Sequence, residues 1–259
     1  MEISHIYDTL VAHKFDQDPF QIYGDSREFA LEQIRKNGPN PDSILDIGMG
    51  TGSLLLKMHE IFPDANLQGL ELSEKMAEVA TAKFSEQKVP VQIHKRAADA
   101  LKQLFKPEQL GLVSIHYVLN YVDTAKTLAD IRDVLQPGGY LSLVTSIQET
   151  FPVMFSLAKN FVSGDFIKEQ IGTPENLKEI ETELEKAGFE IVRLEPFGKE
   201  LVFTDYDHFK DFSLHSGWLA HPFFTQIKPE EEAIYREFSK GLFPLTDWFA
   251  GGIALARRK

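Results

Sequence analysis

The sequence predicts an α/β fold in which helices cover both faces of a doubly wound, mostly parallel sheet. From residue 43 to residue 146, short apolar runs alternate with amphipathic stretches of helical length. The first run, SILDIG, leads straight into a glycine turn, and the second, LQGLEL, has Glu71 as its last residue but one. Strands that alternate with helices of this length imply βαβ crossovers, and such crossovers build parallel sheets.

Local signals define the elements of this region. SILDIG reads as a strand, and the helical pattern SLLLKMHEIF that follows it ends at Pro63. LQGLEL is the second strand, and Ser73 is the expected N-cap of the helix SEKMAEVATAKFSEQK. Pro137 and the two glycines after it stop a later helix. The remaining strands are VQIHKR, LGLVSIHYVL and YLSLVTSI, connected by the helices ADALKQLFK and TLADIRDVLQ.

The pattern loosens after residue 146. Residues 147–173 are rich in aromatic and apolar side chains without a clear period. A helix is expected after Pro174, with Gly188 just past its end, followed by a strand. Residues 206–245 combine aromatic side chains with two helical patterns, and the apolar run FAGGIALARR predicts a last strand.

Composition excludes several classes of function. The chain has 259 residues and a formal net charge of -12, from 39 acidic and 27 basic residues. An acidic surface repels phosphate groups, so we expect no nucleic acid and no membrane partner. The absence of cysteine excludes disulfides, thiolate nucleophiles and cysteine metal sites, and no histidine or carboxylate spacing predicts a metal. No apolar stretch approaches the ~18 residues of a membrane span or forms the core of a signal peptide, so we expect a cytoplasmic protein.

The glycine turn is the first candidate binding element. Gly48, Gly50 and Gly52 form a G-x-G-x-G pattern, which lets a nucleotide approach the backbone and the N-terminus of the next helix. A dinucleotide fingerprint needs glycine or alanine where Ser53 stands, so a pyrophosphate site matches imperfectly. The alternative is a turn that serves tight packing between strand and helix alone.

Two acidic residues follow later strands. Glu71 ends the second strand about twenty residues after the glycines, where a carboxylate accepts hydrogen bonds from both ribose hydroxyls. NAD and S-adenosylmethionine satisfy this position equally, and a solvated acid at a strand end is the alternative. Asp99 follows the third strand, where its carboxylate suits the exocyclic amine of adenine.

Taken together, LDIGMGTG, Glu71, AAD at residues 97–99 and LQPGGYL at residues 135–141 resemble the class I S-adenosylmethionine-dependent methyltransferases of the small-molecule type. The resemblance covers residues 43–146. It implies a Rossmann-like, seven-stranded sheet with a helical cap. It also implies three regions along the chain: an N-terminal helical lid at 1–40, a cofactor-binding core at 41–146, and the completion of the sheet at 147–259, with cap insertions at 147–173 and 206–245.

The same resemblance implies a set of residues around S-adenosylmethionine. Asp46 and the three glycines would line its methionine and ribose side, and Glu71 would bind the ribose. The remaining implied contacts are Leu72, Ala98 and Asp99 at the adenine, His116 near the methionine part, and Tyr23 and Arg27 at the cofactor carboxylate. His116 and His215 are the candidate catalytic residues, and His221 lies in the same late insertion as His215.

The late part of the chain suggests a substrate. ELVFTDYDHFKDFSLHSGW and FPLTDWFAGGIALARR are similar to the carboxyl half of malonyl-carrier-protein O-methyltransferases of biotin synthesis. This similarity favours O-methylation of a small-molecule or carrier-protein-bound substrate. We expect the protein to be a monomer or homodimer.

Two other functions compete with a methyltransferase. A non-catalytic sensor would bind the same nucleoside without transferring a methyl group. An NAD(P)-dependent reductase is suggested by Tyr206 and Lys210, which form a Y-x-x-x-K pattern, although the preceding residues lack the serine that such enzymes need.

Overall fold

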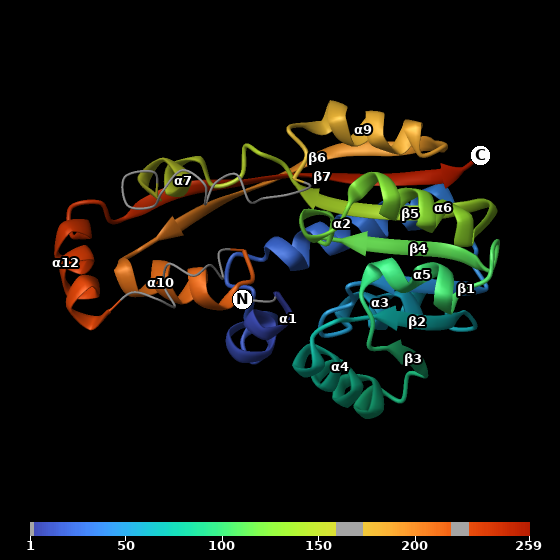
Figure 1. Ribbon diagram of the computed structural model, residues 1–259, viewed down its shortest axis with the longest axis horizontal. Helices are drawn as coiled ribbons and strands as arrows, with labels where there is room; N and C mark the ends of the chain where they lie inside the picture. The colour runs from blue at the N-terminus through green and yellow to red at the C-terminus, as the bar shows by residue number, and fades with distance from the viewer. Residues whose placement is uncertain (1–2, 159–172, 219–227) are drawn as a thin grey trace.

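The computed structural model describes residues 3–158, 173–218 and 228–259. These residues contain a seven-stranded sheet with the order β3-β2-β1-β4-β5-β7-β6 (Figure 1). β1 to β5 run parallel, and β7 is antiparallel to both of its neighbours, β5 and β6. The predicted doubly wound, mostly parallel sheet is therefore confirmed. Its strands are β1 (Ser43–Ile47), β2 (Asn66–Leu70), β3 (Val91–His94), β4 (Leu110–His116), β5 (Leu135–Ser146), β6 (Phe189–Phe203) and β7 (Leu245–Arg258).

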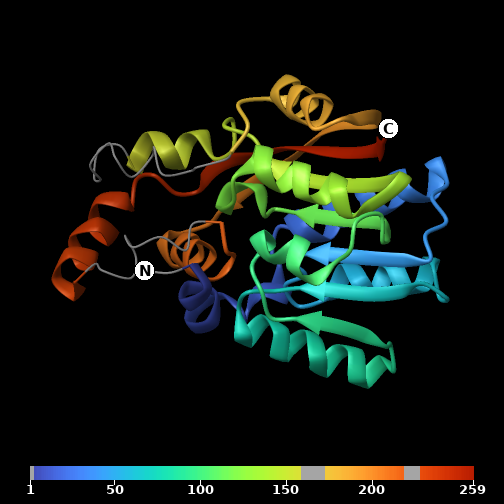
Figure 2. The same ribbon diagram turned by 45° about the vertical axis from the view of Figure 1, so that its right-hand side comes forward.

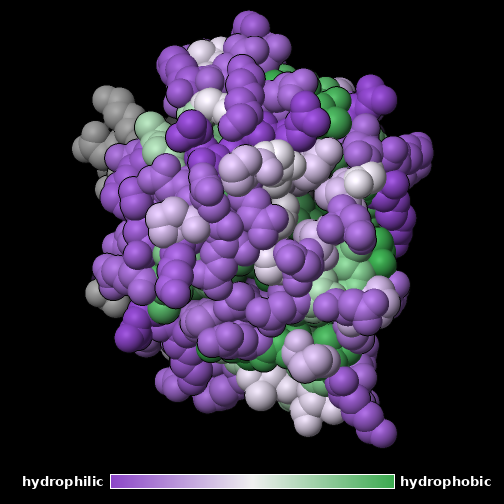
Figure 3. All heavy atoms as spheres, turned by 90° about the vertical axis from the view of Figure 1, so that its right-hand side faces the viewer, coloured by the Kyte–Doolittle hydropathy of each residue, from purple (hydrophilic) through white to green (hydrophobic). Residues whose placement is uncertain are grey.

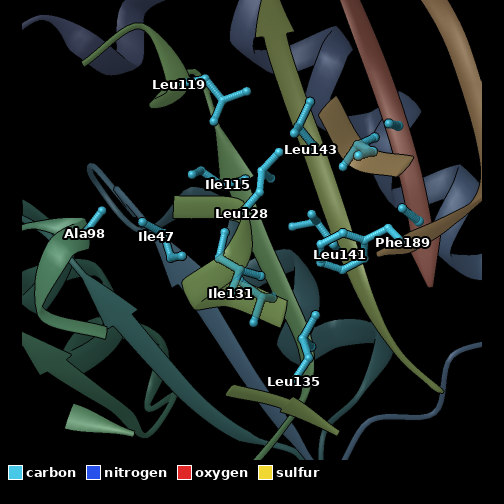
Figure 4. Packing of buried hydrophobic residues seen from close by; sticks show 14 of the residues in the cluster. Ile47, Ala98, Ile115, Leu119, Leu128, Ile131, Leu135, Leu141, Leu143 and Phe189 are labelled. Atoms are coloured by element: carbon cyan, nitrogen blue, oxygen red, sulfur yellow. The ribbon is translucent and has the colours of Figure 1, made fainter. Parts of the chain in front are cut away.

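Helices cover both faces of the sheet. Apolar side chains of α2, α3 and α4 pack with β1 and β2 in one buried cluster, and those of α6 and α9 pack with β4, β5 and β7 in another. Figure 4 shows the second cluster, in which Leu128 and Ile131 of α6 face Ile115 and Leu141 of the sheet. These helices are α2 (Ile22–Asn37), α3 (Ser53–Ile61), α4 (Glu74–Gln87), α5 (Leu101–Leu104), α6 (Thr124–Val134) and α9 (Leu177–Lys186).

Side-chain caps set where these helices begin. Ser73 accepts a hydrogen bond from the backbone N–H of Met76, so the predicted N-cap of α4 is confirmed. Asp123 caps α6 and Asn176 caps α9 in the same way. Gly188 adopts a φ of 86° just after α9, which is the left-handed conformation that glycine tolerates best.

β6 and β7 form a hairpin that extends past the ends of the parallel strands. The two strands pair from Phe189 and Arg258 to Phe203 and Leu245. Figures 1 and 2 show that the far end of this hairpin carries α10 (Tyr206–His215) and α12 (Pro229–Ser239), with α7 (Pro152–Ala158) beside it. The predicted insertion at 147–173 lies partly outside the described residues, which resume at Thr173.

The two ends of the molecule differ in chemistry. The surface away from the hairpin tip, where the parallel strands begin, is predominantly hydrophilic (Figure 3). At the other end lies a cluster of aromatic side chains that includes Phe151, Phe203, Phe212 and Phe249. In the part of the chain that the structure describes, no helix is both long and apolar enough to span a membrane.

Candidate functional site

A pocket opens where β1, β2 and β4 end, beneath the N-terminal segment. The carboxyl ends of parallel strands are the usual ligand site of an open α/β sheet. The pocket walls come from segments that are far apart in the sequence: the N-terminal helices α1 (Ile3–Ile6) and η1 (Tyr7–Val11), α2, the glycine turn, the end of β2, residues 96–98, the connection after β4, and the pair Gly217 and Trp218.

The three glycines of the turn have different roles. All adopt positive φ, at 69° for Gly48, 55° for Gly50 and 77° for Gly52. A Cβ at Gly52 would lie 2.3 Å from the Phe84 ring, so this glycine lets α3 approach α4. A Cβ at Gly50 would meet nothing closer than 3.7 Å, and its backbone faces the pocket. Gly48 combines both roles, because it lines the pocket and a Cβ there would lie 2.3 Å from Val118, whereas Gly52 serves packing and does not line the pocket.

Glu71 reaches back from the end of β2 to the glycine turn. One carboxylate oxygen accepts a hydrogen bond of 2.9 Å from the Gly50 N–H, and the other accepts one of 2.7 Å from the Ser73 N–H. Burial raises the pKa of Glu71, and these backbone donors oppose the rise. A carboxylate offers about four acceptor positions, so this one retains capacity for further donors.

Asp46, near the end of β1, is buried, with 3% of its surface exposed. The Ser114 hydroxyl, on the neighbouring strand β4, donates a 2.7 Å hydrogen bond to its carboxylate. Burial raises the pKa of Asp46 to about 7, although the Ser114 hydrogen bond and the charge of Arg27 act in the opposite direction.

Arg27 and Tyr23 enter the pocket from α2. Arg27 makes no ion pair within 4 Å among the described residues, and its buried Nε finds no hydrogen-bond partner there. The Tyr23 hydroxyl is engaged, because it donates a 2.8 Å hydrogen bond to the Ser216 carbonyl. Arg27 is thus a half-buried cation of the pocket wall without an anion among the described residues, and it would accept a carboxylate.

The histidines differ in position. His116 lines the pocket, with Nε2 3.1 Å from the Ser142 hydroxyl. Burial, reinforced by the charge of Arg27, lowers the pKa of His116 to about 3. The imidazole is neutral at pH 7 and its conjugate acid is strong, which suits an orienting group better than a general base. His215 lies outside the pocket wall, where its Nδ1 donates to the Leu10 carbonyl at 2.7 Å, and His221 lies outside the described residues.

Of the three residues expected at the adenine, two line the pocket. Ala98 lines the pocket, and Leu72, which is 50% exposed, lies at its rim. Asp99 is exposed and is not part of the pocket wall, because the turn Ala98–Ala100 directs it outward.

Sequence reasoning missed the aromatic wall. Tyr7, Tyr117, Tyr121 and Trp218 line the pocket together with Tyr23. Trp218 comes from the segment after α10 and stacks on Tyr23, with ring centroids 5.0 Å apart and planes inclined by 14°. No periodic or motif signal marks Trp218, because its position depends on how the hairpin tip packs on α2.

The Y-x-x-x-K pair has a structural role. The Arg236 guanidinium lies 4.7 Å from the centre of the Tyr206 ring, and Lys210 forms a 2.7 Å ion pair with Glu232. Both contacts join α10 to α12, away from the pocket wall.

Among the residues that the structure describes, no group of three histidine or acidic side chains could hold a metal ion.

Comparisons with known proteins agree with this geometry. Residues 44–139 match the family described as "Methyltransferase domain". A ubiquinone/menaquinone biosynthesis C-methyltransferase from Desulfotalea psychrophila is 28% identical over 139 residues, which cover 53% of this chain and 55% of the relative. A malonyl-[acyl-carrier protein] O-methyltransferase from Halalkalibacterium halodurans is 27% identical over 151 residues, which cover 57% of this chain and 53% of the relative. The chain therefore spans about half the length of these curated relatives.

The fold also occurs in solved structures. A geranyl diphosphate C-methyltransferase from Streptomyces coelicolor, in complex with Mg²⁺, geranyl-S-thiolodiphosphate and S-adenosyl-L-homocysteine, superimposes with a TM-score of 0.57 at 14% identity. The superposition covers 96% of this chain and 80% of that one. At this identity the likeness concerns the fold alone.

Proposed function

We propose that this chain catalyses methyl transfer to a small-molecule acceptor. It is a class I S-adenosylmethionine-dependent methyltransferase, and residues 44–139 are the part that matches the methyltransferase domain. The observation that carries the proposal is one pocket lined by two chemically different groups of residues, which we assign to a cofactor end and an acceptor end. The cofactor end consists of Gly48, Gly50, Glu71 and Ala98. The acceptor end consists of Tyr117, Asn120 and Trp218.

The residues of the cofactor end fit S-adenosylmethionine. Gly50 carries no side chain and lines the pocket, so a nucleoside can approach the backbone there. The Glu71 carboxylate, which retains acceptor capacity, suits the two ribose hydroxyls, and Ala98 with Leu72 provides an apolar surface for adenine. Arg27, whose buried Nε lacks a partner among the described residues, suits the cofactor carboxylate.

S-adenosylmethionine supplies, when bound, a methyl group that is activated by its sulfonium. This chain has to align the acceptor with that group and exclude water, and such positioning lowers a barrier by ~7–11 kcal/mol. His116 contributes as a neutral side chain held by Ser142, and Tyr7 and Tyr23 close the pocket with their rings. No described side chain has to supply a strong base if the acceptor ionises readily.

The acceptor atom that we propose is oxygen. A malonyl-carrier-protein carboxylate is one candidate, supported by the O-methyltransferase relative named above. The curated relatives also include a C-methyltransferase, so carbon is the competing acceptor atom.

Calorimetric titration with S-adenosylmethionine, S-adenosylhomocysteine and NADH tests the cofactor. Micromolar binding of both adenosyl compounds, with no heat from NADH, is the expected result. Binding of NADH alone would contradict the proposal. Mass spectrometry of a panel of phenols, carboxylates and malonyl-carrier protein, incubated with the protein and S-adenosylmethionine, then identifies the acceptor.

The same incubation separates an enzyme from a sensor. An enzyme adds 14 Da to at least one acceptor and releases an equal amount of S-adenosylhomocysteine. A sensor binds the cofactor with the same affinity but leaves every acceptor unmodified. Tyr117, Asn120 and Trp218 line the same pocket as Gly48 and Glu71, and this favours the enzyme.

A further inference from the structure

We propose that His215 is a positioning residue of the cofactor site, which acts through the N-terminal strap, residues 3–17. His215 lies outside the pocket wall, but it fastens the strap to α10 and thereby slows the release of the bound cofactor. The inference rests on the proposed function, because it concerns the retention of the same cofactor.

The strap forms part of the pocket wall. Tyr7 and Phe15 line the pocket, and the Phe15 ring would lie 3.7 Å from a Cβ at Gly50. The Phe15 ring also packs on the Tyr23 ring of α2, with centroids 4.6 Å apart. In Figures 1 and 2, α1 lies between α10 and α4. We therefore expect the strap to hinder the release of a cofactor that is bound against Gly50.

The strap packs as a small unit of its own. Its buried residues Ile6, Val11 and Ala12 form a cluster with Met76 of α4, apart from the two large clusters that join the helices to the sheet. Segments with few buried contacts open at a lower free energy than the core. The strap can therefore lift while the sheet stays folded, and its polar contacts determine how often this happens.

Two carboxylates fasten the strap on the side of the cofactor. Asp8 accepts a 2.6 Å hydrogen bond from the Ser73 hydroxyl at the start of α4. Asp16 accepts one of 2.7 Å from the Thr51 hydroxyl in the glycine turn, and it pairs with Lys83 of α4 at 2.7 Å. On this side the strap is held by the elements that form the cofactor end of the pocket.

His215 fastens the strap on its other side, to α10. Leu10 lies in the last turn of η1, where carbonyl oxygens lack the N–H of a following turn. The His215 Nδ1–H donates to this carbonyl at 2.7 Å, and 18% of the His215 side chain is exposed. Because this hydrogen bond is largely shielded from water, its loss should free the strap on this side.

An ion pair reinforces this contact one turn earlier on α10. Asp211 pairs with Lys14 of the strap at 2.5 Å and lies 3.6 Å from Nε2 of His215. The His13 ring meets the His215 ring edge to face, with centroids 5.2 Å apart. The Asp211 side chain is 51% exposed, so we expect the ion pair to contribute less than the hydrogen bond of His215.

The residues that follow His215 reach the pocket directly. Gly217 and Trp218 line it, and a Cβ at Gly217 would lie 3.0 Å from the Tyr7 hydroxyl of the strap. His215 therefore stands where the strap meets the segment that carries the acceptor end. Through this junction the position of α10 affects how long the cofactor stays bound.

Release of S-adenosylhomocysteine from the full chain tests the inference. Protein loaded with the tritiated compound is mixed with an excess of the unlabelled compound, and the bound label is followed by rapid filtration. His215→Ala should accelerate release about fivefold, which corresponds to the loss of one hydrogen bond. His215→Asn keeps an N–H donor near the position of Nδ1 and should restore the wild-type rate.

Asp211→Ala supplies a second test at an exposed position, and Lys210→Ala is its matched control. Asp211→Ala removes the ion pair with Lys14 and should accelerate release about threefold. Lys210→Ala removes a comparable ion pair of the same helix, with Glu232 of α12, and should leave the rate unchanged. Hydrogen exchange should accelerate in residues 3–17 of His215→Ala and Asp211→Ala, while exchange in β1 and β4 stays at the wild-type rate.

Three results would overturn the inference and leave the proposed function standing. The first is an unchanged release rate in His215→Ala or in Asp211→Ala. The second is equally fast release from His215→Asn and His215→Ala, which would assign the effect to the imidazole ring instead of its hydrogen bond. The third is equal acceleration in Lys210→Ala, which would reflect a general loosening of α10. Failure of the wild-type protein to bind S-adenosylhomocysteine would overturn the proposed function and this inference together.

Discussion

The two ends of the pocket are built in different ways. At the cofactor end, the Gly50 N–H bonds to Glu71, 21 positions along the chain, while Arg27 and Ala98 come from other segments. At the acceptor end, Tyr117, Phe151, Trp218 and Phe249 meet from four distant segments. The first arrangement depends on backbone conformation, and the second on packing of large side chains.

This difference determines which amino-acid substitutions each end of the pocket tolerates. A turn that uses positive φ and close approach has few alternatives to glycine. An aromatic wall can change its shape through single substitutions while the sheet below it stays intact. Substrate specificity can therefore vary at the acceptor end without loss of the cofactor site, and the following four predictions test this contrast.

The largest effect is expected for Gly52→Ala. Its Cβ would lie 2.3 Å from the Phe84 ring at a φ of 77°. Overpacking and left-handed strain together should lower the free energy of unfolding by about 2–5 kcal/mol. Gly138→Ala is the matched control, with a φ of 75° but no atom within 4 Å, and should cost about 1–2 kcal/mol. Equal losses in urea titrations of the two variants would show that the contact with Phe84 is unimportant.

Glu71→Ala should weaken S-adenosylmethionine binding by about 1.5–3 kcal/mol, because it removes a charged acceptor of the ribose hydroxyls. Glu74→Ala serves as its control, since Glu74 is exposed and pairs with Lys95 on the surface. Calorimetry should find Glu74→Ala within twofold of the wild type. Unchanged affinity in Glu71→Ala would exclude the ribose contact.

Asp46→Asn should change how stability depends on pH. Burial raises the pKa of Asp46 from 3.8 to about 7, so the folded protein loses stability as pH rises through this range. Burial lowers the pKa of His116 from 6.5 to about 3, so stability is lost as pH falls through that range. The two slopes nearly cancel in the wild type between about pH 4 and pH 6.5.

Removal of the Asp46 carboxyl leaves the His116 slope unopposed. Relative to the wild type, the free energy of unfolding of Asp46→Asn should then fall by about 1.4 kcal/mol for each pH unit below 6.5. Asp42→Asn, an exposed position just before β1, should follow the wild-type curve. If denaturant titrations show the same pH dependence of the free energy of unfolding for all three proteins, the opposing pKa shifts of Asp46 and His116 are contradicted.

The smallest effect concerns the N-terminal segment that covers the cofactor end. Asp8 accepts a 2.6 Å hydrogen bond from the Ser73 hydroxyl and one of 3.0 Å from the Lys75 N–H at the start of α4. Asp8→Ala should loosen this contact by about 0.5–2 kcal/mol, the usual cost of losing such a cap. Hydrogen exchange of residues 3–17 and cofactor release should both accelerate. Thr9→Ala, which removes a hydroxyl bonded to His5 within the same turn, should change neither.

Much of the cofactor end could be predicted from the sequence. Gly48, Gly50 and Glu71 line one pocket, as the glycine spacing and the strand end suggested, and so do Ala98 and Arg27, which the family resemblance implied. Asp99 and His215 lie outside its wall. A strand end specifies which edge of the sheet a residue occupies, but the turn that follows decides whether its side chain points inward, and that turn depends on packing.

The sequence by itself determined the βαβ alternation, the glycine turn and the carboxylate at the end of β2, because these depend on period, φ and short spacing. The tertiary structure alone decided that Trp218 stacks on Tyr23 and that the Asn120 Oδ1 has no hydrogen-bond partner within the described part of the chain. Contacts between residues almost two hundred positions apart leave no local pattern, since they form when the hairpin of β6 and β7 packs its tip against α2.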